Sequence, residues 1–276
     1  MEARWRPAPG GVPGSGDETS EGGERRRGMV ASREAGRRLD DGLSVEAGWS
    51  RGMDGNLAFL PRVPSRRGGW ALGAAGVDLR RTARRWAERG GRGLGIVPRP
   101  RYVRPGRLVV LWDVSGSMSS YVPLYLPWMH RLVQVHPGAG VFPFGTHLVD
   151  ATAALRRPVA LAMLELAGLE GPWSGGTSIG EMLHQWIDTY GPRWLRAGTT
   201  VVVVSDGWDS GPPERVADGL ARMRARGAVV YWMNPLAATP GFEPRTRALR
   251  AALPHIHRLV AGESPRALLR FVRVGT

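Results

Sequence analysis

The chain has 276 residues, of which 42% are hydrophobic, so it is long enough for one large domain with extensions. It contains no cysteine, which excludes disulfide bonds, thiolate-bound metals and cysteine nucleophiles. The net charge is +14 and all 38 basic residues are arginine; because the chain is also rich in alanine, glycine and proline, we attribute this excess to coding bias and do not expect nucleic acid as a partner.

The sequence carries no signal for a membrane. No apolar run approaches the roughly 20 residues that a bilayer-spanning helix needs. The arginine-containing N-terminus is not followed by the apolar stretch of a signal peptide. We therefore expect a cytoplasmic protein without a membrane span.

The N-terminal part of the chain shows little regular patterning. Residues 1–60 are rich in glycine, proline, serine and charge without sustained periodicity, so we predict that 1–75 form a largely disordered or weakly structured arm. In 76–89, Leu79, Ala83 and Trp86 recur at helical spacing after Asp78, a possible N-cap, which predicts a short basic helix.

The segment from Pro98 to Arg107 holds three prolines and four arginines, which predicts an extended linker that completes a region over 76–107. The arginines of the helix and the linker could bind phosphates. We favour a solvated basic face or a docking surface for an acidic protein.

From Leu108 onward, strands and helices alternate. Strands are predicted at 108–113, 141–144, 200–204, 228–233 and 256–260, with a further extended piece at 146–151, and helices at 119–136, 158–167, 179–190, 213–226, 245–252 and 265–272. Continuous apolar strands separated by helices indicate a parallel sheet that is covered on both faces. The prediction for 108–276 is therefore one α/β domain with a Rossmann-like, doubly wound, mostly parallel sheet.

A group of oxygen-bearing side chains follows the first of these strands. Asp113, Ser115 and Ser117 come directly after the apolar run 108–112 and occupy alternate positions. In an extended segment alternate side chains share one face, so the three converge beyond the carboxyl edge of the sheet, where open α/β sheets bind ligands. Hard oxygen ligands at that edge suit Mg²⁺, with Mn²⁺ as the alternative.

Two later loops extend this candidate metal site. Thr177 precedes the helix at 179–190, and Asp206 follows the valine-rich strand at 200–204. Two carboxylates would balance a dication, and three hydroxyls would fill positions without adding charge, which leaves one position for a carboxylate from a partner. The predicted ligand set is Asp113, Ser115, Ser117, Thr177 and Asp206, with no catalytic or organic-cofactor residues.

At these three loops the chain resembles the von Willebrand factor A (VWA) domain with its metal-ion-dependent adhesion site (MIDAS). The family pattern is Asp-x-Ser-x-Ser, then Thr, then Asp, and Asp113, Ser115, Ser117, Thr177 and Asp206 supply every position. The resemblance covers about 108–276 and implies the VWA fold, with those five residues as metal ligands.

A narrower resemblance is to the bacterial CoxE-like VWA proteins. It is carried by VDLRRTARRW (77–86), RLVVLWDVSGSM (107–118), FPFGTHL (142–148), WSGGTSIGEML (173–183), VVVVSDGWD (201–209) and YWMNPL (231–236). This resemblance implies an accessory or assembly factor that works with a MoxR-type AAA+ ATPase. Its client would be a metalloenzyme such as a molybdenum-containing carbon monoxide dehydrogenase, offering an Asp or Glu to the metal.

An enzymatic alternative is an α/β-hydrolase-like serine esterase. Ser178 lies in a G-x-S-x-G pattern, and Asp206 and then His255 or His257 follow in the order of a hydrolase triad. The residues before Ser178 are turn formers rather than a buried strand, and no oxyanion loop is recognisable. We therefore favour a protein that is not an enzyme.

Three other residues lie near the candidate metal loops. Asp209 is interpreted as a loop cap or a support for the ligands and is kept out of the ligand set. Trp173 and Trp208 flank the loops and are candidates for contact with a partner.

Overall fold

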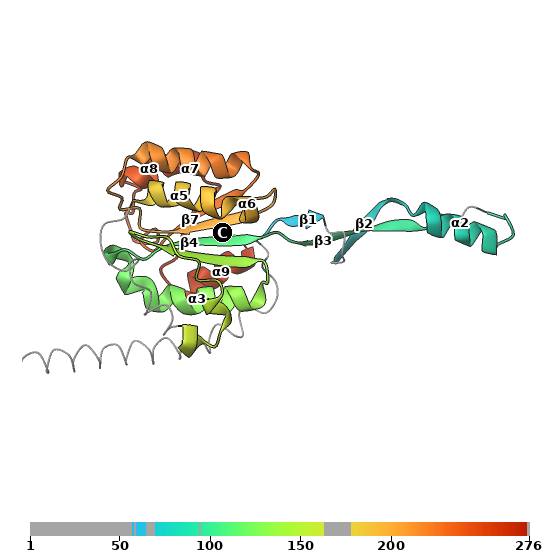
Figure 1. The fold of residues 1–276 in the computed structure, drawn as a ribbon, viewed down its shortest axis with the longest axis horizontal. Coiled ribbons are helices and arrows are strands. Elements are labelled where there is room, and N and C mark those ends of the chain that lie inside the picture. Colours follow the sequence, from blue (N-terminus) through green and yellow to red (C-terminus); the bar gives the residue numbers. More distant parts are fainter. Residues whose placement is uncertain (1–56, 58, 65–69, 94, 163–177, 275–276) are drawn as a thin grey trace, which may run out of the picture. The chain divides into compact units, whose positions relative to one another are not determined.

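The computed structural model describes residues 57, 59–64, 70–93, 95–162 and 178–274 (Figure 1). Most of the arm predicted for 1–75 lies outside the described residues. Within them, one larger sheet flanked by helices holds the candidate metal loops that follow β4 (Leu108–Asp113) and β6 (Thr200–Val204), and a smaller sheet precedes it in the chain.

The larger sheet has five parallel strands in the order β5-β4-β6-β7-β8. The strands are β4 (Leu108–Asp113), β5 (Ala139–Phe144), β6 (Thr200–Val204), β7 (Val229–Asn234) and β8 (Arg258–Ala261). All residues of β4, β5 and β6 are buried, as expected for strands covered on both faces. The predicted doubly wound parallel α/β fold is therefore confirmed.

Helices cover both faces of this sheet, and successive side chains of each strand enter opposite cores. On β4, Val110 and Trp112 pack into one core and Val109 and Leu111 into the other. The first face is covered by α3 (Val122–Val135) and α9 (Pro265–Val274), and the second by α5 (Ile179–Thr189), α6 (Gly191–Trp194), α7 (Pro213–Ala225) and α8 (Arg247–Ala252) (Figure 1).

Short elements and one correction complete this part of the chain. The described residues include three 3₁₀ helices: η1 (Gly116–Tyr121), η2 (Ala154–Arg156) and η3 (Leu253–His255). The extended piece predicted at 146–151 does not form a strand of the sheet. An isolated bridge joins Phe144 to Leu148, and the backbone N–H groups of Val149 and Ala151 donate to carbonyls of β5. The helix predicted at 158–167 is described only as far as residue 162, where it is helical.

The smaller sheet corrects the prediction of a linker. Its strands β1 (Arg62–Pro64), β3 (Pro98–Pro105) and β2 (Trp70–Val77) are antiparallel in the order β1-β3-β2. The segment predicted as an extended linker is thus a paired central strand. Proline lacks a backbone donor, and the pairing of β2 with β3 is accordingly irregular, with two register shifts.

The basic helix is α2 (Leu79–Glu88), and it joins β2 to β3. Its N-cap is the predicted one, because the Asp78 carboxylate accepts a hydrogen bond of 3.0 Å from the backbone N–H of Arg81. The apolar positions do not turn inward: Leu79 is 76% exposed and Trp86 is 47% exposed. Thr82 is the buried residue of the helix, and its hydroxyl accepts a hydrogen bond from the backbone N–H of Val97.

Candidate metal centre

The sheet order creates a switch point between β4 and β6. From β4 the chain crosses to β5 on one side, and then returns to β6 on the other side and continues to β7. Open α/β sheets bind ligands in the crevice at the carboxyl ends of strands at such a point. Asp113 ends β4, and Ser205 and Asp206 follow β6, so both predicted carboxylates lie beside this crevice.

Asp113 is fully buried and held by two hydrogen bonds. The hydroxyl of Ser205 donates to its Oδ2 at 2.6 Å, and the backbone N–H of Ser115 donates to its Oδ1 at 3.0 Å. Ser205 therefore ties the loop after β6 to the end of β4. Its role was missed at the sequence level, although a serine that directly follows a buried strand is a recognisable signal.

The pKa of Asp113 is raised from 3.8 to about 6. Burial is the largest cause and the negative charge of Asp206 adds to it, whereas the hydrogen bonds from Ser205 and Ser115 act in the opposite direction. None of the described groups that act on Asp113 is a cation. Two neighbouring carboxylates at a crevice, one of them desolvated, are a charge arrangement that a bound dication would balance. The two described carboxylates therefore fit the predicted metal.

The two serines of the motif lie together. The hydroxyl oxygens of Ser115 and Ser117 are 3.3 Å apart, and Ser115 is buried whereas Ser117 is exposed. The alternate spacing in the sequence thus places both hydroxyls on one side of the turn after β4, with Ser117 nearer the solvent.

Asp206 sits in a turn whose shape requires glycine. Its carboxylate accepts a hydrogen bond of 3.0 Å from the backbone N–H of Trp208, and the side chain of Asn234 donates to its backbone carbonyl. Gly207 has a φ of +84°, and a Cβ there would lie 2.7 Å from the hydroxyl of Thr246. The turn leaves Asp206 only 5% exposed while Trp208 is 66% exposed.

Thr177 and Trp173 lie outside the described residues, so their predicted places at the site stay predictions. The next element along the chain, α5, is described from its first turn. One carboxylate oxygen of Asp209 accepts 3.0 Å hydrogen bonds from the backbone N–H groups of Ile179 and Gly211. Asp209 thereby fastens the start of α5 to the loop after β6, which agrees with its interpretation as a loop cap.

The structure does not assemble the triad of the esterase alternative. His257 binds the start of β7, where its backbone N–H donates to the carbonyl of Val230, and His255 lies in η3. Asp206 lies at the other end of β7, beside Asn234. Four residues of strand separate the two ends by about 13 Å, so the histidines cannot reach Asp206.

Within the described ranges, no cluster of three or more histidine, cysteine or acidic residues is placed to hold a metal. The predicted set does not depend on such a cluster, because three of its five members are hydroxyls. Likewise, none of the helices in the described part of the chain has the length and apolar content to cross a membrane.

Comparison with known families decides the classification. The model of the family "VWA domain containing CoxE-like protein" matches residues 57–268. The chain belongs to this family. The match begins ahead of the predicted domain start at 108 and so includes the smaller sheet and α2. VWA domains are generally interaction modules rather than catalysts, they often bind a divalent metal at a MIDAS, and membership of the CoxE-like family suggests an accessory role.

Several solved structures are similar to this chain. Proximal thread matrix protein 1 from the mussel byssus is 18% identical with a TM-score of 0.42, over 61% of this chain and 46% of its own length. The conserved hypothetical protein BatB from Bacteroides thetaiotaomicron is 13% identical with a TM-score of 0.41, over 61% and 95%. The SpRpn10 VWA domain is 15% identical with a TM-score of 0.38, over 60% and 93%. No curated protein matches the chain.

Proposed function

We propose that this protein is a Mg²⁺-dependent protein-binding module and not an enzyme. The observation that carries the proposal is the fully buried carboxylate of Asp113 at the switch point, hydrogen-bonded to Ser205 and close enough to Asp206 to feel its charge. The negative charge of a desolvated carboxylate beside a second carboxylate is unfavourable when no cation is present. A bound dication would make that charge favourable.

Five residues would hold the ion. Asp113 and Asp206 would supply negative charge, directly or through water, and the hydroxyls of Ser115, Ser117 and Thr177 would complete the oxygen set. Bound there, Mg²⁺ would act as a Lewis acid with one position left for a carboxylate of the partner. Mn²⁺ is the alternative ion. The exposed ring of Trp208, next to Asp206, would contact that partner.

The wider role is proposed from the family resemblance. We propose that the protein acts in the cytoplasm as an accessory factor together with a MoxR-type AAA+ ATPase. The client would be a metalloenzyme such as a molybdenum-containing carbon monoxide dehydrogenase, and it would offer an Asp or Glu to the metal. Support for this part comes from the family match over 57–268.

Metal binding is tested first, by thermal unfolding with increasing MgCl₂ or MnCl₂. At an ion concentration of 100 times Kd, binding to the folded state should add about 2.7 kcal/mol of stability to the wild type. Asp113→Ala should lose this gain. Asp218→Ala, which removes an exposed carboxylate on α7, is the matched control and should keep it. If the added metal ion stabilised Asp113→Ala and Asp218→Ala equally, the metal proposal would be rejected.

Partner capture is tested separately with the immobilised full chain and a purified MoxR-type ATPase. We expect retention in Mg²⁺, loss in EDTA and loss with Asp113→Ala. Capture that survives EDTA and the Asp113 variant would show that the metal does not make the contact. Failure to capture despite normal metal binding would reject the ATPase as the direct partner.

A further inference from the structure

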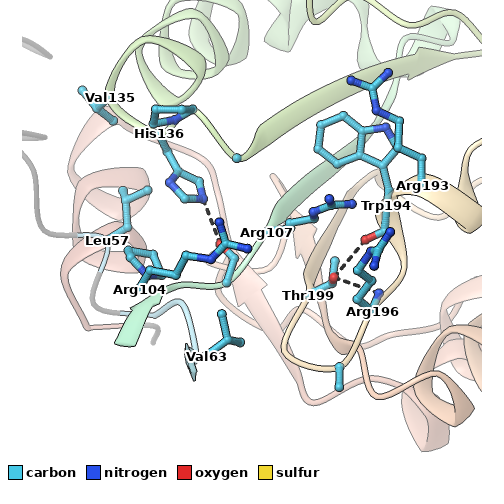
Figure 2. Close-up of a pocket in the computed structure, with 15 residues that line it drawn as sticks. Leu57, Val63, Arg104, Arg107, Val135, His136, Arg193, Trp194, Arg196 and Thr199 are labelled. Carbon is cyan, nitrogen blue, oxygen red and sulfur yellow. Dashed lines mark hydrogen bonds between the residues drawn. The ribbon is translucent and has the colours of Figure 1, made fainter. Parts of the chain in front are cut away.

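A pocket of about 590 Å³ lies at the amino edge of the larger sheet, opposite the candidate metal centre (Figure 2). Its lining includes Arg107, Gly138 and Thr199, which directly precede β4, β5 and β6. Asp113 lies at the far end of β4. Six residues of strand separate the two edges by about 20 Å, so the pocket is not part of the metal centre.

Four arginines line this pocket, and they come from two separate segments of the chain, 104–107 and 193–196. Arg104 lies at the end of β3, Arg107 just before β4, Arg193 in α6 and Arg196 in the loop before β6. In the part of the chain that the structure describes, no ion pair joins any of the four to a carboxylate. Burial lowers the pKa of Arg107, and the charges of Arg196, Arg104 and Arg193 lower it further.

Like charges gathered in this way repel one another, so the fold must hold them together. Gly106 permits the close approach of two of the segments, because a Cβ at this position would collide with the backbone carbonyl oxygen of Gly198. The ring of His136 is 2.9 Å from the carbonyl of Gly106, where its Nε2–H donates. These contacts bring Arg107 and Arg196 to the same cavity, as Figure 2 shows.

Trp194 forms a flat wall of the pocket and orients two of the cations. The guanidinium carbon of Arg107 lies 5.9 Å from the ring centroid and that of Arg193 lies 5.7 Å from it. Gly140 makes room for the ring, since a Cβ on this residue would lie 2.5 Å from it. The hydroxyl of Thr199 donates to the carbonyl of Trp194 at 2.9 Å and so fixes the turn that carries Arg196.

The ring of His136 and the hydroxyl of Thr199 are therefore occupied within the protein, whereas none of the four guanidinium groups has an acidic partner among the described residues. Guanidinium groups match phosphate oxygens in paired hydrogen bonds. The cavity volume is typical of a small-molecule site. Four cations around one cavity suit a compact, multiply charged anion better than an extended chain, which would meet them one after another.

We propose that this pocket binds a small oligophosphate, either as the bare anion or as the phosphate tail of a nucleotide. The site is independent of the metal proposal, because it uses no residue of the carboxyl edge. Apolar side chains also line it, among them Leu57, Val63 and Val135, and they offer a surface for the base of a nucleotide.

The test is isothermal titration of the full chain in EDTA at about 50 mM salt, with sodium tripolyphosphate, ATP, inorganic phosphate and a hexaglutamate peptide as probes. EDTA removes any contribution from the metal centre. We expect one tripolyphosphate or ATP per chain, with inorganic phosphate binding at least tenfold more weakly. Tighter binding of ATP than of tripolyphosphate would assign the pocket to a nucleotide, and the reverse order to the bare anion.

Arg107→Gln and Arg196→Gln should each weaken binding about tenfold or more, since hydrogen bonds between charged groups are lost. Arg250→Gln removes an exposed arginine on α8 and should bind as the wild type does. The proposal is overturned if tripolyphosphate and ATP both fail to bind, if Arg250→Gln is as weak as the pocket variants, or if hexaglutamate binds more tightly than either phosphate probe. Circular dichroism of each variant establishes that it is folded.

Discussion

The two edges of the five-stranded sheet carry opposite charge. At the carboxyl edge, Asp113 and Asp206 meet between β4 and β6, and at the amino edge Arg107 and Arg196 meet before the same two strands. Each edge gathers like charges that would repel without a ligand. The difference teaches that one sheet can gather acidic side chains at one edge and basic side chains at the other, about 20 Å apart, each where the chain enters or leaves the same pair of strands.

The two edges also differ in how they are built. Three of the carboxyl-edge residues, Asp113, Ser115 and Ser117, follow one another in a single turn. Ser205, which donates a hydrogen bond to Asp113, comes from the end of the neighbouring strand β6. The amino edge depends on a close backbone contact between Gly106 and Gly198. The turn that carries Asp113, Ser115 and Ser117 is therefore a local arrangement, whereas the bond from Ser205 and the whole amino edge depend on tertiary contacts.

The largest expected effect is at the carboxyl edge. In EDTA at pH 7.5, Asp113→Asn should raise the free energy of unfolding by about 3 kcal/mol, because it removes a buried charge whose pKa stands about two units above its ordinary value. Urea denaturation measures the change. Asp218→Asn, at an exposed position, should shift stability by less than about 0.5 kcal/mol. A destabilised Asp113→Asn protein would show that the negative charge itself supports the fold.

A smaller change, a loss of stability, is expected when a methyl group is added at the amino edge. Gly106→Ala should destabilise the protein by about 1–3 kcal/mol, because the new Cβ meets a backbone oxygen that cannot rotate away. Gly116→Ala is the matched control at the carboxyl edge, where a Cβ would meet no described atom within 4 Å. Thermal unfolding compares the two variants, and equal stability would mean that the contact at Gly106 yields easily.

The smallest expected effect is a difference between the two edges in how stability depends on pH. Burial lowers the pKa of His136 in the folded state below 6.5, so the unfolded chain binds the proton more readily and stability falls on acidification through this value. Between pH 7.5 and 5.5 in EDTA, the wild type should lose more stability than His136→Gln. His147→Gln, at an exposed position, should follow the wild type.

Asp113 affects the pH dependence of stability in the opposite direction. Its folded pKa of about 6 is above the ordinary value, so its destabilising charge is removed as the pH falls through 6. The Asp113→Asn variant should therefore lose more stability on acidification than the wild type does. If stability depended on pH identically in the wild type, Asp113→Asn and His136→Gln, the two edges would not differ in this respect.

Strand and helix order could be read from the sequence because burial on both faces leaves uninterrupted apolar runs, as at Thr200–Val204, which is a strand with the predicted bounds. The central strand β3 could not be read in this way. Its alternating prolines and arginines lack an apolar pattern, and only its pairing with β1 and β2 makes it a strand. The exposed Leu79 likewise shows that helical spacing predicts a helix but not what covers it.

The sequence alone determined the parallel α/β fold, because uninterrupted apolar runs are short-range patterns. It also predicted a cluster of oxygen-bearing side chains after β4, because Asp113, Ser115 and Ser117 occupy alternate positions there. Only the tertiary structure decided that Ser205 binds Asp113, that Asp209 fastens the start of α5, and that four arginines share one cavity. These contacts join segments far apart in the chain, and their geometry is set by strand register and by glycines that admit close backbone approach, neither of which leaves a local pattern.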